Sequence, residues 1–310
     1  MNKDIPKKDK IFLYFLLPWG GIIICILLFL IVILANYSIP ILLKEGINFF
    51  IKSDWNAIEG APEKEFYGIL SPFIGTLIVS LIAIIIALPL SISLTIFIEH
   101  IAPDRIRGML VNTMEVMAGL PTVLYGLWGV TILAPFLKTY VMDNVYSILF
   151  FIPLFSCRPI SPYTLFTAGI VLAIMIIPFV SSIIRESYEL VPMKYKEAIL
   201  GIGASRYEYS KIMFSLLKPA IIGALLLGLG RAMGETVAVA MTIGNSFNNG
   251  ICIFSPGYTI SSLIANQFGN AGFYKYMTSA LYAGGLLLLL LGVFLNSIAT
   301  YIIIKWRRML

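Results

Sequence analysis

Long runs of apolar residues alternate along this chain with short polar segments. A helix needs about 20 mostly apolar residues to cross the hydrocarbon core of a bilayer. Runs of that length lie near residues 11–36, 70–97, 109–136, 164–184, 219–244 and 278–304. The pattern therefore predicts an all-α, polytopic membrane protein with six transmembrane helices.

The segments between these runs differ in character. Residues 137–163 are apolar, but Pro153, Pro159 and Pro162 interrupt them, and proline breaks helices. We therefore expect a re-entrant or interfacial loop there. Residues 38–67 form the longest predicted outer loop, and their apolar first part is compatible with a helix lying on the membrane surface.

Composition agrees with a membrane protein. The chain is 59% hydrophobic and 12% charged, whereas a soluble domain carries about 25% charged residues. The net charge of +6 is spread around the apolar runs instead of forming one patch, which argues against nucleic-acid binding. The first run is too long for a signal-peptide core and should be retained. We expect a multi-pass protein in the bilayer of the cell (plasma or inner) membrane.

Lysine and arginine favour one orientation. If both termini are cytoplasmic, fifteen of them fall in inner segments and six in outer ones, as the positive-inside rule requires. Residues 185–218 then form the longest cytoplasmic loop. Charged and apolar residues alternate there at helical spacing, which predicts two short helices around Gly201 and Gly203. This amphipathic surface suits a cytoplasmic partner or, alternatively, lipid headgroups.

Residues typical of metal or redox sites are scarce. Cys25, Cys157 and Cys252 show no metal or C-x-x-C spacing, and His100 is the single histidine. We expect unpaired cysteines that only pack, although Cys157 and Cys252 fall in predicted outer loops where a disulfide is possible. The sequence predicts no metal site, no catalytic residue and no cofactor of its own. It also lacks nucleophile and nucleotide motifs, so ATP would have to bind another chain.

Two charges interrupt the fifth apolar run. Arg231 lies near the middle of the predicted helix 219–244, and Glu235 lies one turn further on the same face. A charge inside a bilayer costs about 2.5 to 3.5 kcal/mol on insertion scales and usually marks a pathway. We expect Arg231 to attract an anion along a water-lined path while Glu235 restrains it. The alternative is a structural ion pair that neutralises itself.

Glycines and one further acid accompany this pair. Gly228, Gly230 and Gly234 would let another helix approach closely. Glu115 falls in the third predicted helix, which we expect Pro121 to kink. Glu115 either belongs to the transport path, extends its side chain to the membrane surface, or pairs with Arg231 or with a base of a loop.

Two stretches resemble a known family. The loop 185–218 resembles the EAA loop of type I ABC importer permeases, although Ile199 replaces the second alanine and Ser215 and Leu216 stand where the motif ends in L-P. The matching loop residues are Glu197, Ala198, Gly203 and Ala204. The stretch 228–236, G-L-G-R-A-M-G-E-T, is similar to the fifth-helix signature of phosphate ABC transporter permeases of the PstC type.

The likeness extends from residue 67 to the last helix. Further matching stretches are 67–70, 75–77, 115–126 and 255–262. The resemblance implies the MetI-like permease architecture. It divides the chain into residues 1–69, with the tail, first helix and outer loop, and a permease domain at 70–305.

The resemblance also implies a mechanism. A PstA-like second permease, two PstB-like ATPases that hold ATP and Mg, and a PstS-like phosphate-binding protein would complete the importer. The ATPases would act on the EAA-loop residues. The path for inorganic phosphate would be lined by Arg231, Glu235, Thr236 and Glu115.

Other functions remain open at this point. The chain could pass another oxyanion, such as molybdate or sulfate, because an arginine in the membrane attracts anions in general. A stand-alone secondary anion transporter is a second alternative, although no inverted repeat is visible. A membrane-embedded enzyme would need clustered acids or histidines, and the predicted helices hold only Glu115 and Glu235.

Overall fold

The structure, a computed structural model, describes residues 7–247 and 250–308. The rest of the predicted N-terminal tail, with Lys3, lies outside these residues. Within them, six helices are long and apolar enough to cross a membrane, which confirms the polytopic helical prediction. These spans are Tyr14–Glu45, Leu70–Ile101, Thr122–Leu149, Leu165–Glu189, Arg206–Gly234 and Met277–Trp306.

Thirteen α-helices and two short strands make up most of the described residues. The α-helices are α1 (Lys7–Glu45), α2 (Asn48–Ile51), α3 (Leu70–Ile96), α4 (Asp104–Gly119), α5 (Thr122–Trp128), α6 (Ala134–Leu137), α7 (Asp143–Leu149), α8 (Leu165–Glu189), α9 (Met193–Gly201), α10 (Arg206–Gly234), α11 (Val237–Thr242), α12 (Ile260–Gln267) and α13 (Met277–Arg307). Two short strands, β1 (Trp55–Asn56) and β2 (Phe66–Tyr67), pair antiparallel in the predicted outer loop.

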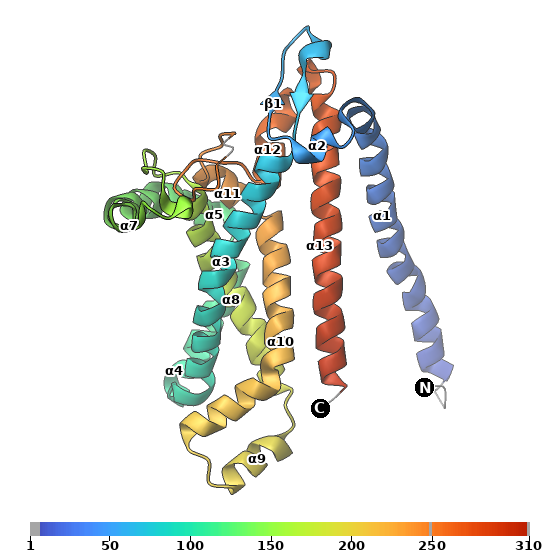
Figure 1. Ribbon diagram of the computed structural model, residues 1–310. Coiled ribbons are helices and arrows are strands. Elements are labelled where there is room, and N and C mark those ends of the chain that lie inside the picture. Colours follow the sequence, from blue (N-terminus) through green and yellow to red (C-terminus); the bar gives the residue numbers. More distant parts are fainter. Residues whose placement is uncertain (1–6, 248–249, 309–310) are drawn as a thin grey trace.

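The helices form a bundle around α8. This helix packs against α3 and α10, while α13 packs on α10 and α1 packs on α13 (Figure 1). The small residues Ala83 and Ala87 of α3 are buried in the same hydrophobic cluster as Leu172 and Ile176 of α8, and small side chains let two helices approach closely. The start of α1, the end of α13 and α9 all lie at one end of the molecule (Figure 1). Which end faces the cytoplasm stays a prediction.

The third span differs from the predicted one. It runs from Thr122 to Leu149, so that the predicted helix 109–136 is wrong and part of the predicted loop is helical. Pro121 ends α4 instead of kinking a continuous helix, because Leu120 before it adopts an extended conformation with ψ 139°. The later prolines, at positions 153, 159 and 162, follow this span and lie outside α-helices, as predicted.

The fifth span is also displaced. Helix α10 begins at Arg206, where Ser205 and Glu208 form a capping box, so the second short helix of the predicted loop is continuous with the membrane helix. The ribbon changes direction within α10 (Figure 1), and Pro219, which cannot donate a backbone hydrogen bond, lies inside it.

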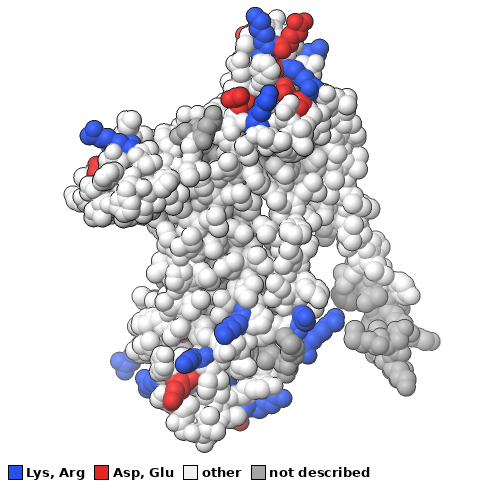
Figure 2. All heavy atoms as spheres, viewed as in Figure 1, with Lys and Arg blue, Asp and Glu red and all other residues white. Residues whose placement is uncertain are grey.

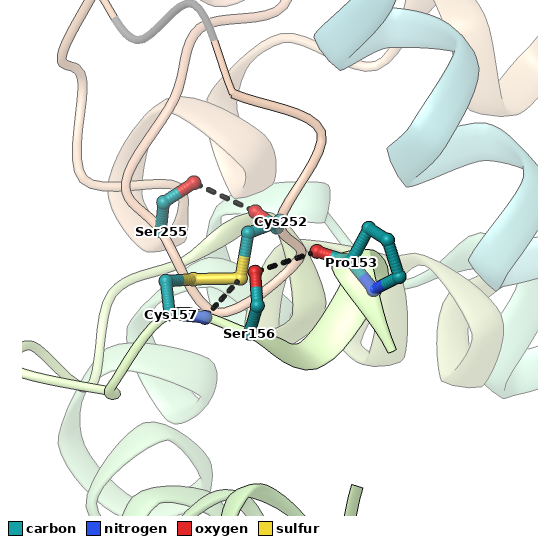
Figure 3. Close-up of a disulfide and its surroundings, with 5 residues drawn as sticks. All are labelled: Pro153, Ser156, Cys157, Cys252 and Ser255. Carbon is teal, nitrogen blue, oxygen red and sulfur yellow. Dashed lines mark hydrogen bonds between the residues drawn. A yellow bond between two sulfur atoms is a disulfide. The ribbon is translucent and has the colours of Figure 1, made fainter. Parts of the chain in front are cut away.

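A disulfide joins Cys157 to Cys252, and the prediction that both are unpaired is therefore wrong (Figure 3). Their Cα atoms lie 6.1 Å apart although 95 positions separate them in sequence. A backbone hydrogen bond from Ile253 to Leu154 O, 3.0 Å long, holds the same two loops together. Sequence spacing could not reveal this pair, since only the fold brings the loops into contact. The remaining cysteine, Cys25, is exposed and free.

Charged side chains gather at the two ends of the molecule, with a broad uncharged zone between them on the face that Figure 2 shows. At the end opposite α9, the carboxylate of Glu65 is buried. It accepts hydrogen bonds from the backbone N–H groups of Lys275 (3.2 Å) and Tyr276 (3.1 Å), just before α13, and from the Tyr67 hydroxyl (3.0 Å). Burial and this hydrogen bond raise the pKa of Tyr67. Glu65 thus attaches the strand pair to the start of α13.

Glu65→Gln should lower the thermal unfolding midpoint of the detergent-solubilised protein. An amide offers one acceptor oxygen where the carboxylate uses two, so at least one buried donor loses its partner, at about 1 to 3 kcal/mol. The matched control is Glu63→Gln, since Glu63 is an exposed acid of the same loop. Equal midpoints for the two variants would show that Glu65 does not anchor α13.

Candidate functional site

The apolar run 219–244, predicted as one helix, breaks where the sequence carries its two charges. Helix α10 ends at Gly234, Glu235 is extended (φ −68°, ψ 127°), and a separate helix, α11, starts at Val237. The predicted continuous helix 219–244 is therefore wrong. Because the backbone turns out of the helix at Glu235, its side chain does not lie one turn above Arg231 on a common helical face.

Arg231 lies in the last turn of α10 and is half-buried. Its guanidinium carbon stands 4.8 Å from the ring centroid of Phe179 on α8, a cation–π contact. It also interacts electrostatically with Tyr125 on α5. None of the ion pairs found among the described residues involves Arg231. The guanidinium keeps donors for an anion, and the negative end of the α10 dipole favours its charge.

Side chains satisfy the backbone groups that the break exposes. The Glu235 carbonyl accepts a hydrogen bond of 2.7 Å from the Ser261 hydroxyl, and the Gly234 carbonyl accepts one of 3.3 Å from the Thr236 hydroxyl. The Ala238 N–H, in the first turn of α11, donates to the Glu235 carboxylate at 3.5 Å. The acid therefore offers an acceptor to one free N–H group in the first turn of α11.

The break is anchored through Ser261 to two more elements. The Thr259 hydroxyl caps α12 and lies 3.0 Å from the Ser261 hydroxyl, while the backbone N–H of Ile260 donates to the Thr76 hydroxyl on α3 (3.0 Å). In the sequence, stretches 75–77 and 255–262 stand out only as points of likeness to a known family. Their hydroxyl residues meet at one place, which a linear pattern does not disclose.

Glycines permit the close approaches around this region. A Cβ on Gly75 would collide with the carbonyl of Tyr258, so α3 and the loop before α12 could not come together with any larger residue. A Cβ on Gly228 would lie 2.8 Å from Val180 of α8, and one on Gly230 would lie 2.9 Å from Asn296 of α13. A Cβ on Gly234 would meet no described atom within 4 Å. Close helix packing therefore explains Gly228 and Gly230 but not Gly234.

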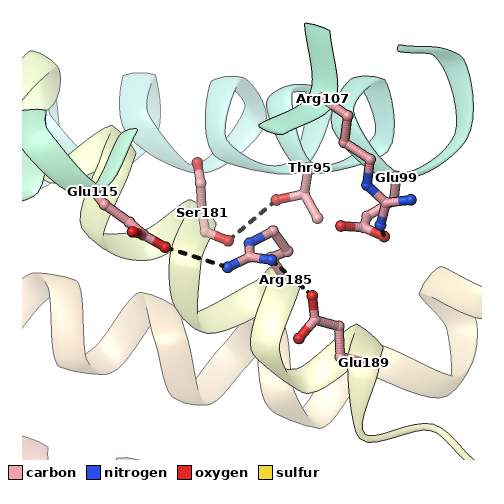
Figure 4. Close-up of polar contacts among 7 residues, drawn as sticks. All are labelled: Thr95, Glu99, Arg107, Glu115, Ser181, Arg185 and Glu189. Atoms are coloured by element: carbon pink, nitrogen blue, oxygen red, sulfur yellow. Dashed lines mark hydrogen bonds and ion pairs between the residues drawn. The ribbon is translucent and has the colours of Figure 1, made fainter. Parts of the chain in front are cut away.

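Glu115 lies outside the membrane spans. It belongs to α4, which ends before the third span begins, and its side chain is 62% exposed. Its nearest cation is Arg185 at the end of α8 (3.7 Å), which also pairs with Glu189 at 2.7 Å (Figure 4). The prediction that Glu115 lies within the third membrane helix is therefore wrong, because α4 precedes that span. The structure pairs Glu115 with Arg185, which was predicted to lie in the loop 185–218. A role of Glu115 in transport stays a prediction.

A second group of polar residues lies beside this one. Glu99, in a π-helical turn (Phe97–Ile101) after α3, is only 2% exposed and pairs with Arg107 (Figure 4). The next residue, His100, makes edge-to-face contacts with Tyr188 and Tyr209, and Lys196 of α9 lies 4.4 Å above the Tyr188 ring. Helix α9 is thus tied to the ends of α3, α8 and α10 through aromatic rings.

Helix α9 carries the residues of the predicted coupling loop. Glu197 and Ala198 are exposed on it, whereas Ile199 is buried at 7% exposure in a cluster with Met213, Leu217 and Trp306. An isoleucine in place of the second alanine of the motif therefore fixes α9 to the bundle through its apolar side chain. After α9, Gly203 has φ +76°, a conformation that suits glycine, and half-buried Ala204 follows.

Comparison with known proteins agrees with this geometry. A family model described as "Binding-protein-dependent transport system inner membrane component" matches residues 103–308. The chain is 46% identical over 308 residues to the probable phosphate transport system permease protein PstC of Methanocaldococcus jannaschii, covering 98% of this chain and 96% of the relative. It is 38% identical over 266 residues to the phosphate transport system permease protein PstC of Xylella fastidiosa strain Temecula1, covering 84% and 78%.

Gly75→Ala should lower the thermal midpoint of the purified protein, because its methyl group meets a backbone carbonyl that cannot rotate away. Gly108→Ala, at a helical glycine with open space around it, is the matched control and should leave the midpoint unchanged or raise it slightly. A Gly75→Ala protein as stable as the control would mean that α3 and the loop before α12 do not make this contact.

Proposed function

This chain belongs to the family of binding-protein-dependent transport system inner membrane components, and on that premise we propose that it is the membrane-spanning permease subunit of an ATP-driven phosphate importer. The names of its relatives support phosphate as the substrate over molybdate or sulfate. We place it in the cell (plasma or inner) membrane with both termini and α9 at the cytoplasmic side.

The main support for a phosphate path in this chain is Arg231, which lies in a membrane span and forms no ion pair with a described acid. Charged residues in membranes pair with one another or with backbone carbonyls and mark ion or substrate pathways, so an arginine without a carboxylate partner is suited to a transient anionic one. The planar guanidinium can donate two parallel hydrogen bonds to phosphate oxygens.

The residues at the helix break would help the bound anion to leave. Helix α10 ends just before Glu235, and α11 begins just after Thr236. Discontinuous helices of this kind line substrate sites in many transporters. We propose that Glu235 and Thr236 lie along the path beside Arg231. The carboxylate of Glu235 disfavours a long stay of a second negative charge, which a path needs in order to release its substrate.

Helix α9 is the proposed contact with the energy source. Its exposed residues Glu197 and Ala198, with Gly203 and Ala204 after it, would bind one of two PstB-like ATPases, which would hold ATP and Mg. A PstA-like permease would form the other half of the channel, and a PstS-like binding protein would deliver phosphate to the outer loops. Closure of the ATPases would move α9 and, through Ile199, the bundle.

Arg231→Gln should lower uptake of labelled phosphate by about tenfold or more, because a charge-assisted hydrogen bond contributes about 1.5 to 3 kcal/mol. Arg231→Lys should keep part of the activity, since the charge remains but the paired donors are lost. The control is Arg158→Gln, an exposed arginine outside the spans. Uptake is measured in cells with the whole system, with sulfate and molybdate as competitors. Normal uptake in Arg231→Gln would make Arg231 structural, and stronger inhibition by sulfate or molybdate than by unlabelled phosphate would change the substrate.

Glu197→Lys should lower phosphate uptake strongly while the partner ATPases continue to hydrolyse ATP, because it reverses a charge on the surface that would receive their motion. Glu186→Lys makes the same charge change at an exposed position of α8 and should leave the ratio of phosphate moved to ATP hydrolysed unaltered. If both variants transport equally, α9 does not couple through Glu197.

A further inference from the structure

A groove of about 850 Å³ lies between the lower end of α3 and the first half of α10. Apolar side chains form most of its wall, among them Ile96 of α3 and Phe214 and Ile222 of α10. Ile222 is 49% exposed, so this wall is not covered by the rest of the chain. A surface of this kind has a partner in the assembled protein or in the membrane.

Three cations line the same groove. Arg206, Lys211 and Lys218 lie on α10, all three are exposed, and none takes part in an ion pair found among the described residues. The acid on this part of the helix, Glu208, accepts hydrogen bonds from the N–H (2.8 Å) and hydroxyl (2.7 Å) of Ser205. The groove therefore presents a net positive charge beside an apolar wall.

Along α10, the cations Arg206, Lys211 and Lys218 come before the apolar Ile222. Ile222 lies well inside the fifth span, while Ile96 lies near the end of the second, so the apolar wall extends from that end towards the hydrocarbon core. Arg206 and Lys211 lie at the start of the fifth span, towards α9, where lipid headgroups are expected. An apolar wall suits the acyl chains of a phospholipid, and the cations beside it suit an anionic headgroup.

We propose that this groove binds an anionic phospholipid of the leaflet on the α9 side, with its acyl chain against Ile96 and Ile222 and its headgroup against Arg206, Lys211 and Lys218. This site goes beyond the proposed phosphate path and does not depend on it. A free phosphate ion would leave the apolar wall exposed. A soluble protein segment would have to enter the hydrocarbon core to cover that wall, where its backbone polar groups need partners.

The first test asks what occupies the groove in the assembled transporter. A benzophenone amino acid replaces Ser215, which lines the groove, and the complex is irradiated in nanodiscs of equimolar phosphatidylglycerol and phosphatidylcholine. The adducts should be lipid, with phosphatidylglycerol enriched about tenfold or more. The same probe at Ile132, an exposed residue of the third span, should capture the two lipids equally. Capture of a partner chain from position 215, or equal capture of both lipids there, would overturn the proposal.

The second test removes the three positive charges of the groove. The triple variant Arg206→Gln, Lys211→Gln, Lys218→Gln should lose the enrichment, while Arg105→Gln, Lys305→Gln, Arg308→Gln, which removes equal charge outside the groove, should keep it. If the first triple variant does not assemble, Lys218→Gln alone decides, with an expected loss of about fivefold. Equal enrichment in the groove variant and its control would refute a headgroup site and leave only a general attraction to the surface.

Discussion

The hydrogen-bonding requirement of backbone inside a membrane governs the site. Lipid offers no donors or acceptors, so a helix can break there only if other groups satisfy the freed N–H and C=O groups. At the end of α10 these groups are supplied by Ser261, Thr236 and the carboxylate of Glu235. Because Ser261 lies on α12, which is itself held to α3 through Thr76, the break depends on segments from across the chain.

The same requirement shapes the environment of Arg231. The C-terminal end of a helix places its free carbonyl groups, and the negative end of its dipole, beside the residues of its last turn. The arginine is stabilised there without a carboxylate, and Phe179 supports it with a ring face in place of a counter-ion. A carboxylate in contact would have bound it permanently. This environment stabilises the cation without a carboxylate, as the proposed contact with phosphate requires.

Hydrophobic patterning predicted the number of spans because bilayer thickness fixes the length of each apolar run. It placed the second, fourth and sixth spans well, but not the boundaries near Pro121 and Glu235, where backbone conformation rather than composition decides. The likeness of residues 228–236 singled out Arg231, Glu235 and Thr236 as candidates but did not reveal the break, since Gly234 and Thr236 are compatible with a continuous or a broken helix. Contacts between Cys157 and Cys252, or Thr76 and Ile260, depend on tertiary packing alone.

The disulfide has a mechanical consequence. It closes a covalent ring that contains α8, α9, α10 and α11, with 95 positions between its cysteines. The loops before α8 and after α11 are thereby held at a fixed separation, while α9 lies at the opposite end of the molecule (Figure 1). A force applied at α9 can then change the angle between α8 and α10 but cannot draw these two loops apart. The disulfide therefore keeps the loops before α8 and after α11 together while α9, at the other end of the molecule, changes its position.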